Sequence, residues 1–324
     1  MSDHKIAVYI SSRNNYDMLQ REVMKNVNLK DFYFVNVDDS SSYEEMQKGK
    51  SICKDNNITF ISNKGRGLFA AADTAITHIK DAVGSTEFVL WLTHDCYPLD
   101  QDFIDKLDVL ARSGALSDFG AVGFNTLWRH QNGMNVEQFI RKFPDRKFCA
   151  TMGRAVLTPV PGAGWYRSND WEMNWDVWGK NIAVESVVDM SLLINTRAFD
   201  EITPDESYQH FCWADDMCLQ FMMNGRYNVT LADHFVYHDQ SIKEKYGIPK
   251  HSYRAASHGD MKHFCKHDSH YPIWLSKWKF DRNWQKTSQK IPDDVVASYE
   301  GSLIHDFMTH DRKLGPLKTF EIDL

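Results

Sequence analysis

Acidic and basic side chains of this sequence gather in a few short clusters whose residue types suit phosphate and metal chemistry. Asp38 and Asp39 form an acid pair that can accept hydrogen bonds from a base edge and a ribose. Arg66 lies between two glycines, which would let a phosphate approach the backbone closely. Asp95 offers the oxygen ligand that a hard divalent cation needs. These residue types together indicate a site for a diphosphate and its cation.

Two further groups lie later in the chain. Asp215 and Asp216 stand at the start of a helical pattern, where a carboxylate could act as a general base. His238 follows as a further candidate metal ligand. Each cluster also has a simpler structural interpretation: an acid pair marks a turn, an acid caps a helix or faces its dipole, and a lone histidine is usually structural. The order and spacing of the whole set favour a functional site.

Regular elements that could position these residues alternate through the first third of the chain. Short runs rich in Val, Ile and aromatic residues predict strands, and segments with helical spacing follow them; Ser42 and Glu45 form a capping box before one helix. This alternation predicts an α/β fold with a mainly parallel sheet, whose ligands bind at the carboxyl ends of the strands. The expected strands are Lys5–Ile10, Asp31–Val37, Ile58–Ser62 and Glu87–Thr93, and the expected helices are Tyr16–Asn26, Leu68–Val83 and Asp100–Ala111.

The alternation of strand and helix patterns stops at about residues 125–183. This stretch is rich in Trp, Pro and Gly, and we interpret it as an insertion of long loops. Regular patterns return with a strand-like run at Val184–Asn195, a short helix at Arg197–Ile202, a helix at Phe211–Asn224 closed by Gly225, and a strand at Tyr227–Asp233. We therefore expect a catalytic domain at residues 1–240 and a helical or irregular extension at residues 241–324, with acceptor binding as one role of the extension.

The ordered set of motifs resembles the GT-A-fold glycosyltransferases of the family-2 type. No single motif is specific, but together they span about Lys5 to Ser241, with a gap across the Trp-rich insertion. The resemblance implies a Rossmann-like central sheet flanked by helices and a site for a nucleotide-diphospho-sugar. The matching segments are IAVYISSRN, VDDSSS, NKGRGLFAAADTAI, FVLWLTHDCYPLDQDFIDKL, VVDMSLLINTRAFDEI, WADDMCLQFMMNGRYNV and VYHDQS.

The resemblance also implies roles for individual residues. Asp95 matches the last acid of the family's D-x-D metal motif, and His238 matches a late histidine that reaches the metal or the diphosphate. Aromatic rings are common in sugar sites, so Trp165 and Trp213 are candidate acceptor contacts. The candidate nucleotide-binding residues are Ser11, Arg13, Asp38, Asp39, Asn63, Gly65, Arg66 and His94.

Two departures from the family pattern affect the chemistry. Thr93 stands where the first acid of D-x-D is usual, so a single side-chain carboxylate would face the cation. The family's E-D-x-D segment reads W-A-D-D when Gly225 is used as the anchor, which puts Ala214 at the usual base position. We favour Asp215 over Asp216 as the base, with the other left as the alternative.

The sequence thus predicts a transferase that moves a sugar from a nucleotide-diphosphate donor, UDP-sugar favoured, to an acceptor hydroxyl. Inversion at the anomeric carbon and assistance by Mn²⁺ or Mg²⁺ are implied by the resemblance. A glycan is the first expectation for the acceptor, and a hydroxymethylated pyrimidine in phage-type DNA is the second. The alternative is a nucleotide-sugar-binding or nucleotidyltransferase-like protein without glycosyl transfer, which the missing first acid favours.

Composition bounds these expectations. The net charge is −7, so a polyanion partner would need a local basic patch. The sequence shows no signal peptide and no apolar stretch long enough to span a bilayer, so we expect a cytoplasmic protein, in the host cytoplasm if phage-encoded. The cluster KHFCKHDSH (His263, Cys265, His267, His270) reads as a surface cluster, with zinc binding as the alternative. The segment Trp274–Lys286 reads as a packed amphipathic helix, with polyanion binding as the alternative.

Overall fold

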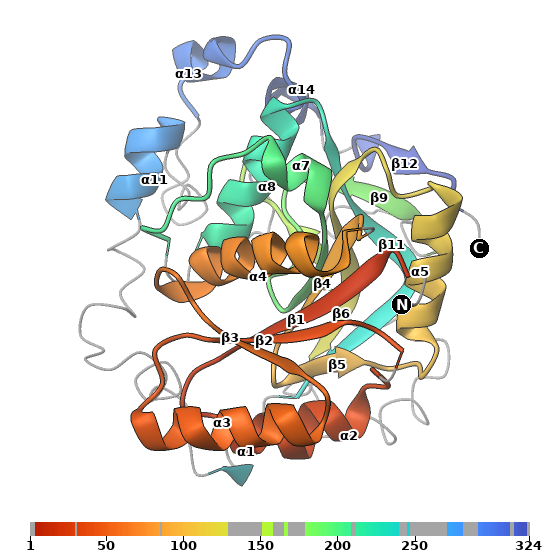
Figure 1. The fold of residues 1–324 in the computed structure, drawn as a ribbon. Helices are drawn as coiled ribbons and strands as arrows, with labels where there is room; N and C mark the ends of the chain where they lie inside the picture. The colour runs from red at the N-terminus through yellow and green to blue at the C-terminus, as the bar shows by residue number, and fades with distance from the viewer. Residues whose placement is uncertain are drawn as a thin grey trace.

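The alternation of strands and helices expected from the sequence is present in the computed structural model (Figure 1). No helix in the described parts of the chain is both long and apolar enough to cross a membrane. The structure describes residues 4–29, 31–84, 86–128, 151–157, 165–167, 179–208, 212–239, 245–246, 271–280, 291–311 and 314–322.

The first half of the sheet is parallel. Strand β1 (Ile6–Ser12) pairs with β2 (Phe34–Asp38) on one side and with β4 (Phe88–Leu92) on the other, and β3 (Thr59–Ser62) extends the sheet beyond β2. All four strands were expected from the sequence. Because they run in one direction, the polar residues that follow them meet at one edge of the sheet.

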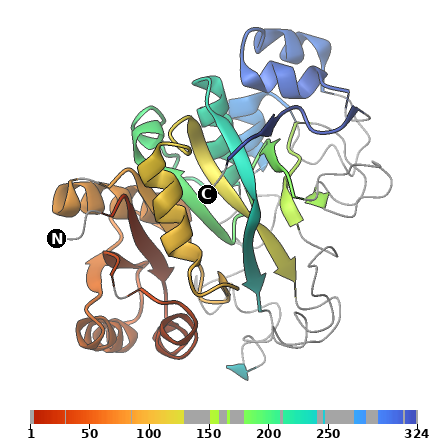
Figure 2. The same cartoon turned by 90° about the vertical axis from the view of Figure 1, so that its right-hand side faces the viewer.

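The second half of the sheet is mixed. Strand β10 runs antiparallel between β4 and β6, β11 is parallel to β6, and β9 and β12 extend the sheet beyond β11 (Figure 2). Shorter strands attach to this half: β5 pairs with β11, and β7 pairs with β6 and β8. The bounds are β5 Cys96–Pro98, β6 Phe119–Trp128, β7 Thr151–Arg154, β8 Trp165–Arg167, β9 Asn181–Val184, β10 Ser191–Asn195, β11 Tyr227–His238 and β12 Thr319–Phe320.

Two expectations need correction here. The strand-like run Val184–Asn195 is not one strand: β9 ends at Val184, and β10 starts only at Ser191 on the other side of β6 and β11. Between them, Ser186 leaves the strand path to form a bridge with Arg154. In addition, β6 was not expected and continues to Trp128, so regular structure reaches into the segment interpreted as an insertion from about residue 125.

Helices cover both faces of the sheet, and side chains alternate between two cores. On β1, Ala7 and Tyr9 point to one core, while Ile6, Val8 and Ile10 point to the other. The first core packs under α4 (Gly67–Val83), α7 (Thr196–Asp200), α8 (Trp213–Met223), α11 (Tyr271–Trp278) and α14 (Leu303–Thr309). The second packs under α1 (Tyr16–Met18), a π-helical turn (Leu19–Val23), α2 (Met24–Asn26), α3 (Tyr43–Asp55) and α5 (Phe103–Ser113).

Helix ends follow the expected sequence signals. The Ser42 hydroxyl accepts a hydrogen bond of 3.3 Å from the backbone N–H of Glu45, which caps α3. Gly225 follows α8 with φ +75°, in the left-handed region that glycine adopts without strain. These local signals set where α3 begins and where α8 ends, and so fix the direction of the next strand.

The extension packs on the first core. Trp274 and Trp278 of α11 are buried, which supports the packed-helix interpretation for the described part of Trp274–Lys286. Helices α13 (Asp293–Ser298) and α14 follow, and the chain then returns to the sheet as β12 beside β9 (Figure 2). The candidate zinc cluster at His263, Cys265, His267 and His270 lies outside the described residues.

Candidate functional site

The register of the parallel strands brings most of the predicted site residues to one edge. Ser12 is opposite Asp38, Asp38 is opposite Ser62, and Ile10 is opposite Leu92. The residues immediately after these positions therefore lie on neighbouring strand ends. They are the predicted residues Arg13, Asp39, Asn63, Gly65, Arg66, His94 and Asp95, with Ser11 and Asp38 one step inside.

The two acids after β2 have different partners. Asp38 accepts a 2.6 Å hydrogen bond from the Tyr16 hydroxyl and a 3.3 Å bond from the Ser41 N–H, so it ties α1 to the turn. Asp39 uses one oxygen, Oδ1, to accept from Asn63 Nδ2 at 2.9 Å and from the Gly67 N–H at 3.1 Å. Within the described residues, Asp39 Oδ2 has no hydrogen bond, which makes Asp39 the better placed of the pair to meet a ligand.

The loop from Asn63 to Gly67 is held by its own side chains. Asn63 Oδ1 accepts from the Gly65 N–H at 3.3 Å and from the Thr74 hydroxyl at 3.2 Å. A Cβ on Gly65 would lie 2.8 Å from the Ala70 Cβ, so a larger residue there would force the loop to shift away from the helix. Arg66 is exposed directly before α4, where helix N–H groups and a cation together favour a phosphate.

His94 contacts the residues at the end of the neighbouring strand β1. Its Nε2 lies 3.0 Å from the Ser12 hydroxyl and its Nδ1 lies 3.3 Å from Asn15 Nδ2, and the residue is only 2% exposed. Burial lowers its pKa to about 4, against the opposing effect of Asp95, so the ring is neutral at pH 7. These contacts hold the ends of β1 and β4 together, and the contact of His94 with the nucleotide stays a prediction.

The two predicted metal ligands meet. His238 Nε2 lies 3.2 Å from Asp95 Oδ2, and both side chains are nearly buried. Strand β5 joins them, because His238 of β11 is opposite Cys96. A carboxylate oxygen and an imidazole nitrogen are donors that Mn²⁺ accepts, so the pair fits a divalent cation. No group of three potential ligands occurs among the described residues, so other donors, such as diphosphate oxygens, would have to complete the coordination.

Thr93, which stands where the resemblance would put a first acid, has a structural partner. Its hydroxyl donates a 3.0 Å hydrogen bond to the carbonyl of Met190, in the turn before β10. The side chain is thereby directed to the neighbouring strand. Thr93 therefore fixes the turn that contains Asp189 and Met190 beside the segment that carries Asp95.

Asp215 lies in a buried polar cluster. Its Oδ1 accepts a 2.7 Å hydrogen bond from the Ser186 hydroxyl, and its Oδ2 lies 3.5 Å from Arg154 Nη1. The same guanidinium nitrogen lies 3.1 Å from Asp189 Oδ2. The Asp215 side chain is 0% exposed, and those of Arg154 and Asp189 are 15% and 13% exposed. One arginine thus faces two carboxylates.

Asp216, one residue later, belongs to different surroundings. It accepts hydrogen bonds of 2.8 Å from Trp278 Nε1, 2.8 Å from Lys277 Nζ and 2.7 Å from Gln220 Nε2. Burial raises its pKa, and Lys277 acts in the opposite direction. Its role in the structure is to hold α11 on α8. The structure therefore does not bring Asp215 and Asp216 to one point, although they are adjacent in the chain.

Of the two predicted acceptor contacts, only the Trp213 side chain lies within the described residues, and the contact at Trp165 stays a prediction. Trp213 is fully buried and meets the Trp91 ring edge-on at 4.9 Å between ring centroids, so it is a core residue without a surface for an acceptor. The hydrophobic residues that surround Trp213 in the helix could have predicted from the sequence that it is buried. Trp165 lies on β8, but its side chain is outside the described residues.

Several residues of the site were missed from the sequence. Ser12 hydrogen-bonds to Asn36 and His94, Tyr16 holds Asp38, and Ser186, Arg154 and Asp189 surround Asp215. One usable signal existed: Asp189 is an acid that interrupts the apolar run VVDMSLL. Arg154 could not be identified as a site residue from the sequence, because it lies in the stretch that has no regular hydrophobic pattern.

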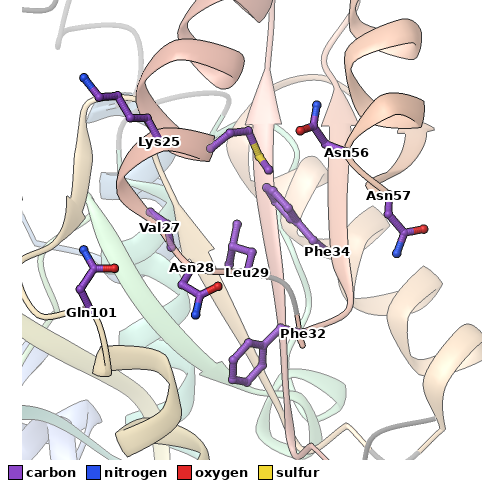
Figure 3. Close-up of a pocket in the computed structure, with 10 residues that line it drawn as sticks. Lys25, Val27, Asn28, Leu29, Phe32, Phe34, Asn56, Asn57 and Gln101 are labelled. Carbon is purple, nitrogen blue, oxygen red and sulfur yellow. The ribbon is translucent and has the colours of Figure 1, made fainter.

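Two cavities lie away from this edge. One of 470 Å³ is lined by residues around the start of β2, among them Leu29, Phe32 and Phe34 (Figure 3). The other, of 560 Å³, is lined at the starts of β6 and β11 by Phe119 and Tyr227. Both positions are at the amino ends of their strands, whereas the predicted donor residues follow the carboxyl ends. Neither cavity coincides with the predicted donor site.

Comparison with known proteins supports the fold. No family model matches the sequence, and no curated protein matches it. Among solved structures, GalNAc-T7 with UDP, GalNAc and Mn²⁺ is similar with a TM-score of 0.50 and 13% identity, over 73% of this chain and 44% of that one. The mannosyltransferase PcManGT from Pyrobaculum calidifontis, in complex with GDP-Man and Mn²⁺, gives 0.46 and 14%, over 78% and 60%. Residues 1–349 of TarS from S. aureus give 0.47 and 15%, over 90% and 82%.

The likeness to GalNAc-T7 concerns the fold. The chain covers less than two thirds of the first two proteins, so the similarity concerns one part of each. Its sheet, with a parallel first half and the antiparallel β10 between β4 and β6, is the part on which the site residues stand. The chain has the mixed α/β fold of the GT-A glycosyltransferases.

Proposed function

We propose that this protein transfers a sugar from a nucleotide-diphospho-sugar, with a UDP-sugar as the favoured donor, to an acceptor hydroxyl. One observation carries the proposal: the Asp95–His238 pair lies on the same sheet edge as the Asp39–Asn63 network. This arrangement supports a cation site beside a nucleotide site. GalNAc-T7, which shares the fold, was solved with UDP and Mn²⁺.

The nucleotide would bind along the ends of β1, β2 and β3. Asp39 has an unbonded carboxylate oxygen among the described residues to receive a ribose hydroxyl or base N–H. Arg66, exposed before α4, would meet the diphosphate together with the first N–H groups of the helix. Arg13 and Ser11, at the end of β1, are the remaining candidate contacts.

Asp95 and His238 would hold a divalent cation, Mn²⁺ or Mg²⁺. Such a cation neutralises charge on a departing diphosphate. Donors from two segments would also offset the missing first acid: His238, at the end of β11, would supply a ligand that Thr93, just after β4, does not supply.

A carboxylate must take the proton of the acceptor hydroxyl as its oxygen bonds to the anomeric carbon. Asp216 is engaged by three donors, two of them from α11. Asp215 is therefore the better supported of the two predicted bases, and we place the proton acceptor in the cluster it forms with Arg154 and Asp189. With water or an alcohol attacking opposite the diphosphate, the reaction would invert the anomeric carbon.

The acceptor class is proposed from the sequence. A glycan hydroxyl is the first candidate, and a hydroxymethylated pyrimidine of DNA is the second. A gel-shift assay with glycosylatable and unmodified duplexes, repeated at rising salt, separates the two, because DNA binding weakens steeply with salt.

A thermal-shift screen of UDP- and GDP-sugars with and without Mn²⁺ tests the donor and the cation. We expect stabilisation by at least one nucleotide sugar that increases with Mn²⁺, and loss of the Mn²⁺ effect in Asp95→Asn. Asp200→Asn is the matched control, since that acid lies on α7 with a half-exposed side chain paired to Lys80. No stabilisation by any nucleotide sugar would reject the proposal.

A second candidate function is nucleotide-sugar binding without glycosyl transfer, and Thr93 favours it because its hydroxyl is directed to Met190 and not to a cation. Release of nucleoside diphosphate from the bound donor distinguishes the two. A transferase releases it, slowly to water or faster to an acceptor, whereas a binding protein leaves the donor intact.

A further inference from the structure

The turn before β10 lies next to the candidate cation site. Ser191 is opposite Leu92, so β10 begins where β4 ends. The Thr93 hydroxyl holds the Met190 carbonyl at 3.0 Å, which fixes this turn against the segment leading to Asp95. Asp189 directly precedes Met190. The fold thus places a second carboxylate at the edge where the anomeric carbon of the proposed donor would lie.

Arg154 holds Asp189 in this position. Its Nη1 lies 3.1 Å from Asp189 and 3.5 Å from Asp215. The backbone of Arg154 is itself fixed by two hydrogen bonds with Ser186, of 2.8 and 3.2 Å. A Cβ on Gly153 would lie 2.9 Å from the Ser186 carbonyl, so only glycine allows this close approach. The guanidinium is therefore set by the strands before it reaches the two acids.

The two acids differ in access. The Asp215 side chain is 0% exposed, with Ser186 on one oxygen and Arg154 beside the other. The Asp189 side chain is 13% exposed, and Arg154 is its hydrogen-bond partner in the described structure. A general base must come within hydrogen-bond reach of the proton it takes. Asp189 has exposed surface that an acceptor can approach without a rearrangement of the core, and Asp215 has none.

A metal-binding role for Asp189 has less support. Among the described residues, no third ligand joins the Asp95–His238 pair. The carboxylate of Asp189 is paired with a guanidinium, which competes with a cation for the same oxygen.

We propose that Asp189 is the catalytic base of the transfer, and that Arg154 and Asp215 are positioning residues. This rests on the proposed function. The acceptor oxygen forms a bond to the anomeric carbon, the bond from that carbon to the diphosphate oxygen breaks with its electron pair leaving on the diphosphate, and the acceptor proton passes to the Asp189 carboxylate and then to solvent. Asp215 supplies the buried charge that keeps Arg154 directed at Asp189.

The test compares Asp189→Asn, Asp189→Glu and Asp215→Asn in the full chain. The donor is the UDP-sugar that stabilises the wild-type protein most, and the readout is release of UDP to water in the presence of Mn²⁺. We expect Asp189→Asn to lower kcat by about 10²–10⁴-fold with donor affinity unchanged, and to remove the acid limb of the pH profile. Asp189→Glu should regain part of the rate, and Asp200→Asn serves as a surface control.

Asp215→Asn separates positioning from proton transfer. It should lower kcat less than Asp189→Asn and keep the acid limb of the pH profile, because the base is still present. A kcat of Asp189→Asn within threefold of wild type overturns the assignment, as does loss of the acid limb in Asp215→Asn alone. Donor binding without any UDP release by the wild-type protein also counts against it, because a carboxylate open to solvent should activate water. Failure to bind any nucleotide sugar would instead overturn the proposed function.

Discussion

Two acids of the predicted site, Asp39 and Asp216, are held in different ways. Asp39 follows a strand and is bonded by Asn63 and Gly67, which are 24 and 28 residues away in the chain. Asp216 lies inside a buried helix and is bonded by Gln220 of the same helix and by Lys277 and Trp278, which are 61 and 62 residues away. The acid after a strand is held by the loop that follows the next strand, whereas the acid on the buried helix takes two of its three partners from another helix.

The largest loss of stability should come from removing the positive side chain of Arg154 beside Asp215. Arg154→Leu removes a counter-charge that lies 3.5 Å from the buried Asp215, and we expect a loss of about 3 kcal/mol in the free energy of unfolding. Urea denaturation measures it. Arg154→Lys should lose less, and the double variant Arg154→Leu, Asp215→Asn should recover part of the loss because the acid is then neutral. Equal losses in the single and double variants would show that Arg154 acts through packing.

A smaller loss of stability is expected from removing the Asp39 carboxylate. Asp39→Ala removes the acceptor of two hydrogen bonds, from Asn63 and Gly67, and should cost about 2 kcal/mol in the free energy of unfolding. Asp39→Asn keeps an acceptor oxygen and is the matched control. If Asp39→Ala proves as destabilising as Arg154→Leu, the contrast between turn-bound and helix-bound acids does not hold.

Stability should depend on pH through Asp216. Burial raises the pKa of this acid above 3.8, so the folded state binds its proton more tightly than the unfolded state does. The stability it contributes is present below about pH 3.8 and is lost as pH rises through the folded-state pKa. Lys277→Met removes the largest opposing effect and should extend that loss, so the variant falls below wild type by about 1 kcal/mol at pH 7 and by less at pH 4.

Urea denaturation between pH 4 and pH 8 measures this difference. Lys80→Met is the control, because its ion pair with Asp200 lies at the surface. A constant gap between wild type and Lys277→Met across the pH range would show that Lys277 stabilises α11 by contact alone.

The smallest effect is expected for Gly65→Ala. The added methyl would meet the Ala70 Cβ at 2.8 Å and the flexible Glu206 carboxylate at 3.0 Å, so the loop has to shift by a few tenths of an ångström. We expect about threefold weaker donor binding, equivalent to about 0.7 kcal/mol, with little change in melting temperature. Titration with the best UDP-sugar measures it. Unchanged affinity would place the nucleotide away from this loop.

The first half of the fold could be predicted because its signals are local. The strands β1 and β4 contain continuous apolar runs, β2 and β3 mix apolar with polar residues, and polar turn residues follow each of the four. The cap at Ser42 and the glycine at position 225 mark helix ends. The meeting of Asp95 and His238 was also expected, through the resemblance. These features need only the chain order and the direction of parallel strands.

The second half could not be read in this way. The run Val184–Asn195 is mostly apolar with scattered polar residues and contributes to two separated strands, with the bridge between Arg154 and Ser186 lying between them. Trp213 carries the same residue type as a sugar platform, yet the aromatic side chains of Phe69 and Trp91 enclose it. Contacts with distant segments determine both the division of the run into two strands and the burial of Trp213. The pattern of a single sequence does not reveal such contacts.

The pairing of β12 with β9 has a consequence for synthesis of the chain. Until residue 320 has left the ribosome, β9 presents an unpaired edge to other nascent strands, a known route to aggregation. The tail also carries Lys318 over the rings of Tyr227 and Phe320, so closure of the sheet and burial of this aromatic group occur in one late step. Expression of this protein should therefore respond to chaperone supply more than its modest size alone would suggest.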